Sequence, residues 1–340
     1  MWNSTFGNIS ERGDVSVASY TLAVVKLLFV PVIIGGNFLV LASVCVFQRL
    51  RTSTNYFLLS LAISDLLVGL LTIPLYAAFY LQAGSLMHNR VACLAWFGSV
   101  ILGCGSSLFN LLLIVLDRFM AIHFPFRYGE LRTPCRVVSA LTGLWVYVVI
   151  LSCLPLMGWN HWDDASKCSF YSTLPKAYVA WSAYLTVGIC ILVSSLLYGK
   201  IFLTVHQHRK KIQALNVASS RENQWMQREV RSTRLSATVF LLFVLFWAPY
   251  FLVGPLKYTS LSQEVVEIIK NTTLVLAFGN SMVNPVVYGL ARKDFRTAYK
   301  VLVVTPITQW GGLRNVPLQG EDAREMVERG ACTTAQTAAH

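Results

Sequence analysis

Seven long stretches of almost uncharged residues limit the folds open to this chain more than any other feature of its sequence. They cover residues 27–48, 52–89, 91–116, 137–162, 177–199, 235–256 and 271–291, and Asp65 is the one acidic residue inside them. Each stretch reaches the roughly 20 residues that a helix needs to cross a hydrocarbon core of about 30 Å. Lipid offers the backbone no hydrogen-bond partner, and the stretches lack the alternating pattern of a β-barrel. The sequence therefore predicts seven transmembrane helices.

The composition excludes most soluble alternatives. Of the 340 residues, 55% are hydrophobic and 13% are charged, which is about half of the roughly 25% charged residues typical of soluble domains. The net charge of +12 does not indicate nucleic-acid binding, because the basic residues lie between the apolar stretches. We therefore expect membrane lipids, and no nucleic acid, as partners of the chain. The eight cysteines form no CxxC pair or His/Cys cluster, which argues against a zinc site.

The distribution of basic residues predicts the orientation in the membrane. Most Lys and Arg residues follow the first, third, fifth and seventh stretches, so the positive-inside rule places the N-terminus outside and the C-terminus in the cytosol. We expect an extracellular tail over 1–19, a seven-helix domain with a short amphipathic helix over 20–304, and a disordered cytoplasmic tail over 305–340. Asn3 and Asn8 begin glycosylation triplets in the outer tail.

Polar side chains at membrane depth are a second informative feature. Asp65 is expected in the middle of a transmembrane helix, where a charged group is costly and therefore indicates a function. Other polar residues lie at comparable depth: Asn37, Ser107, Asn110, Asn280, Ser281 and Asn284. Carboxylate, amide and hydroxyl oxygens suit a hard cation such as sodium, or a shared proton. A purely structural hydrogen-bond network between helices is the alternative.

An ion pair is expected where the third and sixth helices reach the cytosol. Asp117 and Arg118 follow the third stretch, and Glu229 precedes the sixth. An arginine shared between carboxylates on two helices makes a breakable contact, which is the basis of a switch. An arginine that snorkels to the membrane boundary is the alternative. Pro249 can kink the sixth helix beside Trp247, so that rotation of this ring couples a pocket to the helix end.

Taken together, these residues resemble the class A, rhodopsin-like G-protein-coupled receptors, and the resemblance covers every helix. The motifs that carry it are Gly36-Asn37, Leu61-Ala62-Ile63-Ser64-Asp65, Asp117-Arg118-Phe119, Trp145, Tyr198, Phe246-Trp247-Ala248-Pro249, Asn284-Pro285-Val286-Val287-Tyr288 and Phe295. The resemblance implies an all-α membrane protein, a seven-transmembrane helix bundle with a short amphipathic eighth helix. It also implies a plasma-membrane receptor, not an enzyme, that binds a small extracellular ligand and activates a heterotrimeric G protein.

The same resemblance assigns roles to individual residues. It implies a disulfide between Cys93 and Cys168, which the extracellular redox environment permits. It implies an allosteric sodium site formed by Asp65, Ser107, Asn280 and Asn284, and a switch formed by Asp117, Arg118, Tyr198, Glu229, Trp247, Pro249, Asn284, Pro285 and Tyr288. The fifth helix departs from the family pattern, because Cys190 replaces its usual proline. This departure removes the usual cause of a local bulge and of the inward direction of Ser182 and Thr186.

The expected ligand pocket is largely apolar, and it comprises Val100, Ile101, Cys104, Phe170, Ser182, Thr186, Trp247, Tyr250, Phe251, Leu274 and Phe278. Val100 stands where amine receptors carry an aspartate, so an ammonium group would find no charged partner. The motifs of the chain most resemble the adenosine receptors, with Phe170 matching their base-stacking phenylalanine. Gly254, Ala277 and Phe278 replace the purine- and ribose-binding residues of that family, so the resemblance implies an adenosine-receptor-like lineage without nucleoside recognition.

A lipid mediator is the alternative ligand class. Lys26, Lys257 and Lys270 are expected near the outer rim, where they can meet the phosphate or carboxylate of a lipid whose tail enters the pocket. Snorkelling of these lysines to the lipid headgroups is the competing explanation. Constitutive activity without a ligand is a third possibility. A transporter or an intramembrane enzyme is disfavoured, because the sequence shows no inverted repeat, HExxH or GxSxG motif, or nucleophile–base pair at membrane depth.

Overall fold

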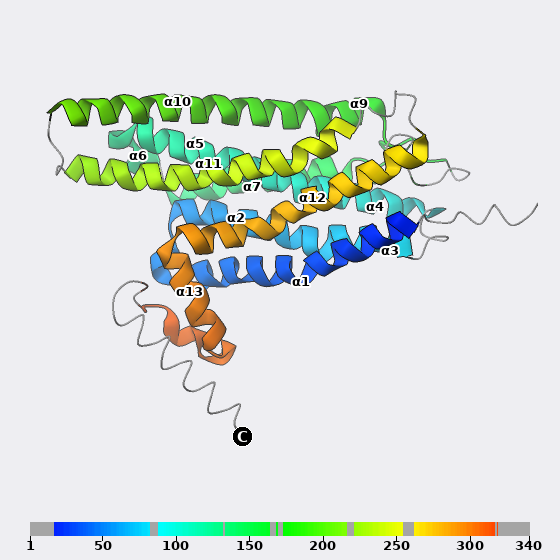
Figure 1. Cartoon of the computed structure of the whole chain (residues 1–340), viewed down its shortest axis with the longest axis horizontal. Helices are drawn as coiled ribbons and strands as arrows, with labels where there is room; N and C mark the ends of the chain where they lie inside the picture. The colour runs from blue at the N-terminus through cyan, green and yellow to red at the C-terminus, as the bar shows by residue number, and fades with distance from the viewer. Residues whose placement is uncertain are drawn as a thin grey trace, which may run out of the picture.

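The computed structural model describes residues 17–81, 88–131, 133–163, 168, 173–215, 221–253, 262–316 and 318. These residues form helices and their connections, with no strand among them. Seven helical segments in this part of the chain are long and apolar enough to cross a membrane. They run side by side along the long axis of the molecule (Figure 1). The predicted fold, a bundle of seven transmembrane helices, is confirmed.

The seven spans are built from helical elements that follow one another along the chain. The first span is α1 (Val17–Val46), and the second combines α2 (Ser53–Leu67), η2 (Val68–Thr72) and α3 (Ile73–Leu81). The third combines α4 (Arg90–Val100), η4 (Ile101–Gly105) and α5 (Ser106–His123), and the fourth is α7 (Pro134–Cys153). The fifth combines α9 (Lys176–Val179), η5 (Ala180–Leu185) and α10 (Thr186–Leu215). The sixth and seventh are α11 (Arg221–Val253) and α12 (Gln263–Ala291). Four shorter helices lie outside the spans: η1 (Gln48–Leu50), α6 (Pro125–Leu131), α13 (Lys293–Val304) and η7 (Ile307–Leu313).

Side-chain caps begin four of these helices. The capping residues are Thr52, Asn89, Thr133 and Ser262, and each accepts a hydrogen bond from the backbone N–H three residues later. Such a cap satisfies one of the N–H groups that the first turn of a helix leaves without a partner. The polar residues at the edges of the apolar stretches therefore fix where α2, α4, α7 and α12 begin.

Three spans contain a π-helical turn, and the one in the fifth span was not expected. The sequence put a bulge in doubt there because Cys190 replaces the usual proline, yet η5 is a π-helical turn. Ser182 Oγ donates to the carbonyl oxygen of Tyr178 at 2.7 Å, and Thr186 Oγ1 donates to that of Trp181 at 2.7 Å. These hydroxyl groups satisfy carbonyl oxygens within the turn, so the bulge forms without proline. The structure therefore removes the doubt that the sequence raised about a bulge in this span.

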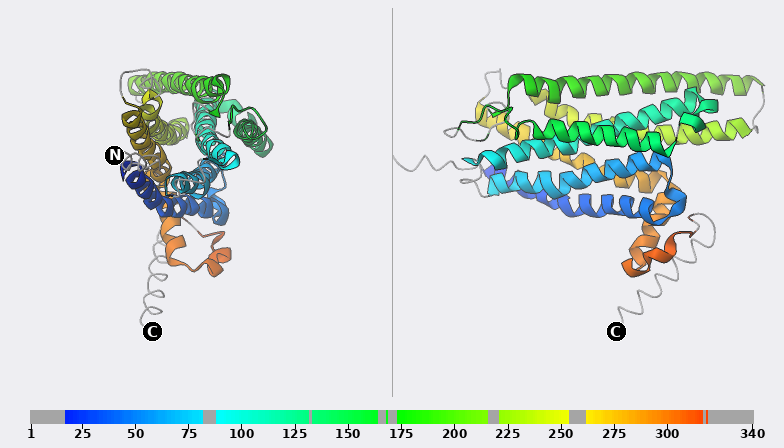
Figure 2. Two further views of the ribbon diagram at one scale, coloured as in Figure 1. Left: turned by 90° about the vertical axis from the view of Figure 1, so that its right-hand side faces the viewer. Right: turned by 180° about the vertical axis from the view of Figure 1, so that it is seen from behind.

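The third span lies at the centre of the bundle. The C-terminal part of this span, α5, packs on α2, α7, α10 and α11, whereas α12 packs on α1 and α11. Figure 2 (left) shows the bundle viewed along its long axis. Two glycines allow the close approach. A Cβ atom on Gly98 would lie 2.7 Å from the carbonyl oxygen of Ser152, and one on Gly103 would lie 2.6 Å from Cγ2 of Val68. Small residues at such crossings let transmembrane helices pack closely.

The chain beyond the seventh span folds back onto the first. The expected amphipathic eighth helix is α13, which turns away from α12 (Figure 1) and packs on α1 and α12. In η7, the ring of Trp310 lies 6.2 Å from that of Phe38 on α1, and the carbonyl oxygen of Arg314 accepts a hydrogen bond from the N–H of Gln48 at 3.0 Å. The expectation of disorder from residue 305 onward is therefore wrong for the described part of the tail, because its apolar side chains pack on α1.

Candidate functional site

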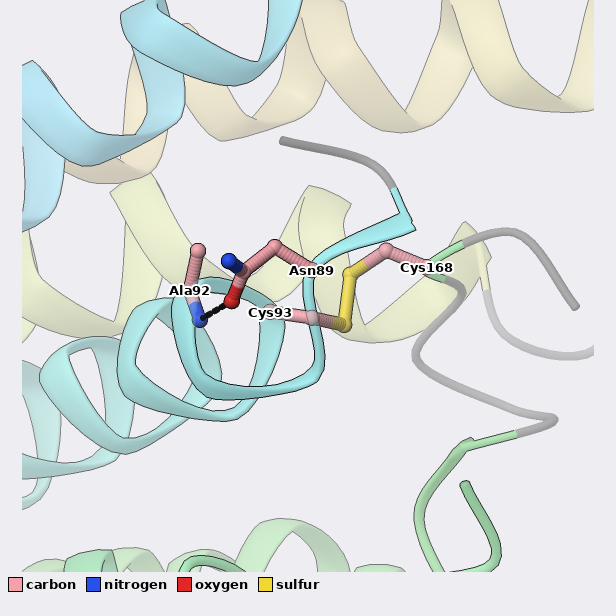
Figure 3. The surroundings of a disulfide bond; sticks show 4 residues. All are labelled: Asn89, Ala92, Cys93 and Cys168. Carbon is pink, nitrogen blue, oxygen red and sulfur yellow. Dashed lines mark hydrogen bonds between the residues drawn. A yellow bond between two sulfur atoms is a disulfide. The ribbon is translucent and has the colours of Figure 1, made fainter. Parts of the chain in front are cut away.

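A disulfide closes one end of the bundle. Cys93 and Cys168 are bonded, with their Cα atoms 5.7 Å apart (Figure 3). Cys93 lies in the first turn of α4, where Asn89 Oδ1 accepts a hydrogen bond from the N–H of Ala92 at 2.9 Å. The cap and the disulfide together fix the start of the third span relative to the segment that carries Cys168. The predicted disulfide is confirmed; this end is hereafter the disulfide end, and the opposite one the α13 end.

A cavity of about 80 Å³ lies between the third, fourth, fifth and sixth spans. Its lining includes most of the predicted pocket residues, namely Val100, Ile101, Cys104, Ser182, Thr186, Trp247, Tyr250 and Phe251. The fourth span adds Val148 and Leu151, which the sequence did not indicate. Which side chains of α7 face the cavity depends on how α7 packs on the third span, and the sequence does not show this packing.

The lining of this cavity is apolar and aromatic. Trp247 lies in a group of rings with Phe243, Tyr250 and Phe251, at centroid distances of 5.9–6.0 Å. Ser182 and Thr186 do line the cavity, but their hydroxyl groups already donate to carbonyl oxygens of their own helix. The cavity therefore favours a ligand held by apolar contact with few hydrogen bonds.

Two predicted pocket residues on α12 lie elsewhere. Leu274 and Phe278 are buried and do not line the cavity. The ring of Phe278 lies 6.4 Å from that of Tyr76 on α3, and the ring of Tyr76 lies 5.8 Å from that of Trp96 on α4. Tyr76, Trp96 and Phe278 are hereafter the aromatic group. Phe170 lies outside the described residues, so its contact with a ligand stays a prediction.

Lys26 is the clearest departure from expectation. The sequence placed it near the outer rim or among the lipid headgroups, but its side chain is fully buried in the bundle. The ammonium nitrogen lies 3.5 Å from the ring centroid of Tyr76 and 6.0 Å from that of Phe278. Its position on the inner face of α1 prevents it from snorkelling to the lipid headgroups. Lys270 is half-buried on α12, and Lys257 lies outside the described residues.

Asp65 is fully buried and accepts hydrogen bonds from α5 and α12. The donors are Asn284 Nδ2 at 2.7 Å, Ser281 Oγ at 2.8 Å and Ser107 Oγ at 3.5 Å. The structure thus brings Asp65, Ser107 and Asn284 together as expected. Ser281 takes part although the predicted sodium site did not include it, and no hydrogen bond joins the side chain of Asn280 to Asp65 among the described residues.

Buried amide oxygens at the depth of Asp65 are of the kind that a small hard cation prefers. The buried Oδ1 atoms of Asn37, Asn110 and Asn280 accept no hydrogen bond from the described part of the chain. A purely structural network would use such acceptors, because buried polar atoms are nearly always paired. Amide and carboxylate oxygens are ligands that hard cations prefer, so these residues are compatible with the sodium ion that the sequence led us to expect.

Arg118 forms a network at the α13 end. It pairs with Asp117 on its own helix and, at 2.5 Å, with Glu229 Oε2 on α11. Three hydroxyl groups contact its guanidinium group and come from Thr54, Tyr128 and Ser232. The side chain of Arg118 is 3% exposed, which is not the geometry of a snorkelling arginine. The predicted contact between Arg118 and Glu229, which joins the third and sixth helices, is therefore present. The sequence motifs did not indicate that three hydroxyl groups would also bond to Arg118.

Other predicted switch residues make no hydrogen bond to Arg118 among the described residues. Tyr198 and Tyr288 are in α10 and α12, and no hydrogen bond joins either hydroxyl group to Arg118 among the described residues. Pro249 and Pro285 lie inside α11 and α12, where each removes a backbone hydrogen bond and permits a kink. Tyr288 lines the same small cavity as Arg118, so the two side chains are neighbours that share no hydrogen bond in the described part of the chain.

A wide cavity opens at the α13 end beside Arg118. Its volume is about 850 Å³. The charged residues that line it are mostly basic: Arg49, Arg118, Arg231, Arg234, Arg292 and Lys293, against Glu229 and Asp294. A concave surface with this excess of positive charge attracts acidic groups.

Comparisons with known proteins agree with this geometry. The family described as 7 transmembrane receptor (rhodopsin family) matches residues 36–288. The chain is 33% identical to the histamine H2 receptor of Canis lupus familiaris, over 83% of this chain and 79% of that receptor. It is 28% identical to the adenosine receptor A2b of Rattus norvegicus, over 82% of this chain and 88% of that receptor. The chain therefore belongs to the rhodopsin family of seven-transmembrane receptors, the class A G-protein-coupled receptors, and is not an enzyme.

Proposed function

We propose that this receptor lies in the plasma membrane with its disulfide end outside the cell and its α13 end in the cytosol. The disulfide supports this orientation, because such bonds persist on the oxidising side of the membrane. The basic residues around the wide cavity support it as well, because loops rich in Lys and Arg stay in the cytosol. Asn3 and Asn8 lie outside the described residues, and their glycosylation stays a prediction.

The proposed class of ligand is inferred from the apolar lining of the 80 Å³ cavity. The names of two relatives point to histamine and adenosine, but the residues that line this cavity include no acidic side chain, and Val100 offers an ammonium group no partner. The hydroxyl groups of Ser182 and Thr186 are engaged within their own helix, so few donors remain to recognise a nucleoside. We therefore propose a receptor of adenosine-receptor-like lineage for a less polar small ligand.

The sixth span connects this cavity to the cytosolic side. Trp247 lines the cavity, Glu229 lies at the far end of the span, and both belong to the continuous helix α11. Pro249 provides a hinge beside Trp247. In the proposed mechanism, a ligand that moves Trp247 tilts α11 and separates Glu229 from Arg118. The opened cavity then accepts an acidic part of a heterotrimeric G protein.

We further propose that sodium binds at Asp65 and stabilises the resting arrangement. Ser107 and Asn284 are the neighbours that would share the ion, with Asn280 as a further oxygen ligand. Asp65→Asn removes the charge that holds the ion. Nucleotide exchange should fall when sodium chloride replaces choline chloride in membranes with the wild-type receptor, and this response should vanish in the variant. An equal sodium response in both proteins would contradict the site.

A lipid mediator is the second candidate ligand, and the buried position of Lys26 favours it. An apolar cavity and a cation inside the same bundle match the two parts of an amphipathic acid.

Nucleotide exchange on a panel of G proteins tests the proposed function. Membranes with the wild-type receptor would be assayed without ligand and with adenosine, histamine and lysophospholipids, beside Arg118→Ala expressed at the same surface level. We expect no response to adenosine or histamine and a loss of coupling in the variant. A response to adenosine would show that the cavity recognises nucleosides, and exchange that does not depend on Arg118 would overturn the proposed mechanism.

A further inference from the structure

The chain after the seventh span contains one more uncharged run. Residues 301–313 are largely apolar and include no Asp, Glu, Lys or Arg, and Lys300 and Arg314 flank them. The run is shorter than the roughly 20 residues that cross a hydrocarbon core, and apolar runs of about 10 to 14 residues are typical of re-entrant or interfacial segments and of buried helices. Its length and its basic flanks are therefore compatible with a segment that enters a membrane and leaves it on the same side.

The structure places the second half of this run against the outer face of the first span. The ring of Trp310 lies 6.2 Å from that of Phe38, which is itself 42% exposed. Phe38 precedes the end of α1 at Val46 by eight residues, which corresponds to about 12 Å along a helix. Figure 2 (left) shows α13 and η7 outside the bundle of spans and next to α1. Trp310 therefore lies beside the apolar part of α1 and not beyond its end.

The run returns to the end of the first span at Arg314. The carbonyl oxygen of Arg314 accepts a hydrogen bond from the N–H of Gln48 at 3.0 Å, and Gln48 begins the short helix η1 that follows α1. The side chains of Lys300 and Arg314, at the two ends of the run, are both exposed. Each can reach lipid head groups while the residues between them lie deeper.

Several polar groups of the run are paired within it. The indole N–H of Trp310 donates to the carbonyl oxygen of Thr305 at 3.0 Å, and the N–H of Gln309 donates to that of Pro306 at 2.9 Å. Pro306 itself has no N–H that needs a partner. Hydrocarbon offers no hydrogen-bond partner, so polar groups inside a membrane need such internal pairing.

Two apolar side chains of the run are not covered by protein. Val303 on α13 and Ile307 on η7 are each 70% exposed. A single exposed apolar side chain needs no explanation, but these two belong to the run that lies beside the apolar part of α1. Phe38, which the same run contacts, lies on the outward face of a transmembrane span. The position of the run therefore selects the acyl chains of the surrounding lipid as what covers these side chains.

We propose that residues 301–313 form a re-entrant anchor that enters the membrane leaflet at the α13 end and contacts phospholipid acyl chains through Val303 and Ile307. Trp310 holds the anchor against α1, and the basic residues at its two ends contact lipid head groups. The anchor does not depend on the identity of the ligand, on the G protein or on which end of the bundle faces the cytosol.

Photolabelling from within the bilayer tests the proposal on the wild-type receptor. Nanodiscs with one receptor each, so that no second copy covers the run, would contain a phosphatidylcholine with a diazirine in one acyl chain. After illumination, mass spectrometry maps the labelled residues. Leu245 in the sixth span is 67% exposed and is the positive reference for lipid contact. Asn315, exposed just after the run, is the negative reference.

We expect labelling of Ile307 within about threefold of that of Leu245, and at least about tenfold weaker labelling of Asn315, because acyl chains contact only inserted residues. Ile307→Asp places in the anchor a charge that is costly in hydrocarbon. It should lower labelling across residues 301–313 by at least about threefold, because a charged anchor leaves the leaflet more often. Asn315→Asp, outside the run, is the matched control and should leave the labelling unchanged.

Three results would overturn the proposal. The first is the absence of label from residues 301–313 in a wild-type receptor that is labelled at Leu245, and this result needs no variant. The second is label on Val303 without label on Ile307, which would place α13 at the membrane surface and leave η7 outside the membrane. The third is equal labelling of residues 301–313 in the wild type and in Ile307→Asp.

Discussion

At the scale of single residues, the contact between Arg118 and Glu229 is the link that the proposed mechanism must break. Arg118 also has Asp117, Thr54, Tyr128 and Ser232 as partners, so it stays satisfied when Glu229 moves away. Glu229 is more exposed than Arg118, with 17% of its side-chain surface accessible. In the proposed mechanism, a movement of α11 therefore separates Glu229 from Arg118 and leaves the other partners of Arg118 in place.

Glu229→Gln should raise ligand-independent nucleotide exchange. The variant keeps the shape of the side chain and removes its charge, which weakens the contact by about 1–2 kcal/mol. A change of this size shifts a two-state equilibrium by a factor of roughly 5 to 30. Exchange in membranes at matched surface expression measures it, with Glu130→Gln at an exposed position on α6 as control. Exchange equal to that of the wild type would show that this pair does not hold the resting state.

At the scale of elements, α13 and η7 show how the chain beyond the seventh span is tied to the first. The hydrogen bond from Gln48 to Arg314 and the contact between Phe38 and Trp310 join segments that are far apart in the sequence. Ile307, at the start of η7, is 70% exposed, so the element has one side against α1 and one side away from it.

Trp310→Ala should loosen this attachment. Loss of the ring removes the contact with Phe38, and the hydrogen bond of the Gln48 amide should open more often. Hydrogen exchange measured by mass spectrometry on a peptide that contains Gln48 would report several-fold faster exchange in the variant. Ile307→Ala, on the exposed side of the same element, should leave the rate unchanged. Equal rates in Trp310→Ala and the wild type would mean that η7 does not protect this amide.

At the scale of the whole molecule, the bundle depends on close approaches between spans. Gly98 has no room for a Cβ atom, because the backbone of Ser152 on α7 occupies that space. A backbone atom cannot yield as a flexible side chain can, so a larger residue must push the third and fourth spans apart. The cavity lies between these spans and the next two, and its shape depends on the same contact.

Gly98→Ala should destabilise the receptor by about 1–3 kcal/mol through overpacking. Gly143→Ala, in α7 with open space around the added Cβ atom, should be neutral or stabilising, since alanine favours a helix over glycine. Thermal unfolding of the two purified variants in the same detergent compares them. A melting temperature of Gly98→Ala equal to or above that of Gly143→Ala would contradict this account of the crossing.

The sequence by itself determined the number of spans, the eighth helix and the contact of Arg118 with Glu229, whereas the disulfide partners were implied by the resemblance to the rhodopsin-like receptors. These features follow from length, hydropathy and motifs, because a lipid environment allows helices as the only solution for long apolar stretches. It also predicted the residues of the third, fifth and sixth spans that line the apolar cavity. The orientation, the sodium ion and the ligand class rest on the same patterns and stay predictions.

The tertiary structure alone decided which residues share a space when they come from distant spans. Ser281, not Asn280, bonds to Asp65, because neighbouring residues on a helix point about 100° apart and the rotation of α12 is set by packing. Lys26 turns to the aromatic group rather than to the headgroups for the same reason. Hydropathy gives the depth of a residue in the membrane, whereas the direction it faces depends on contacts between helices that no local pattern contains.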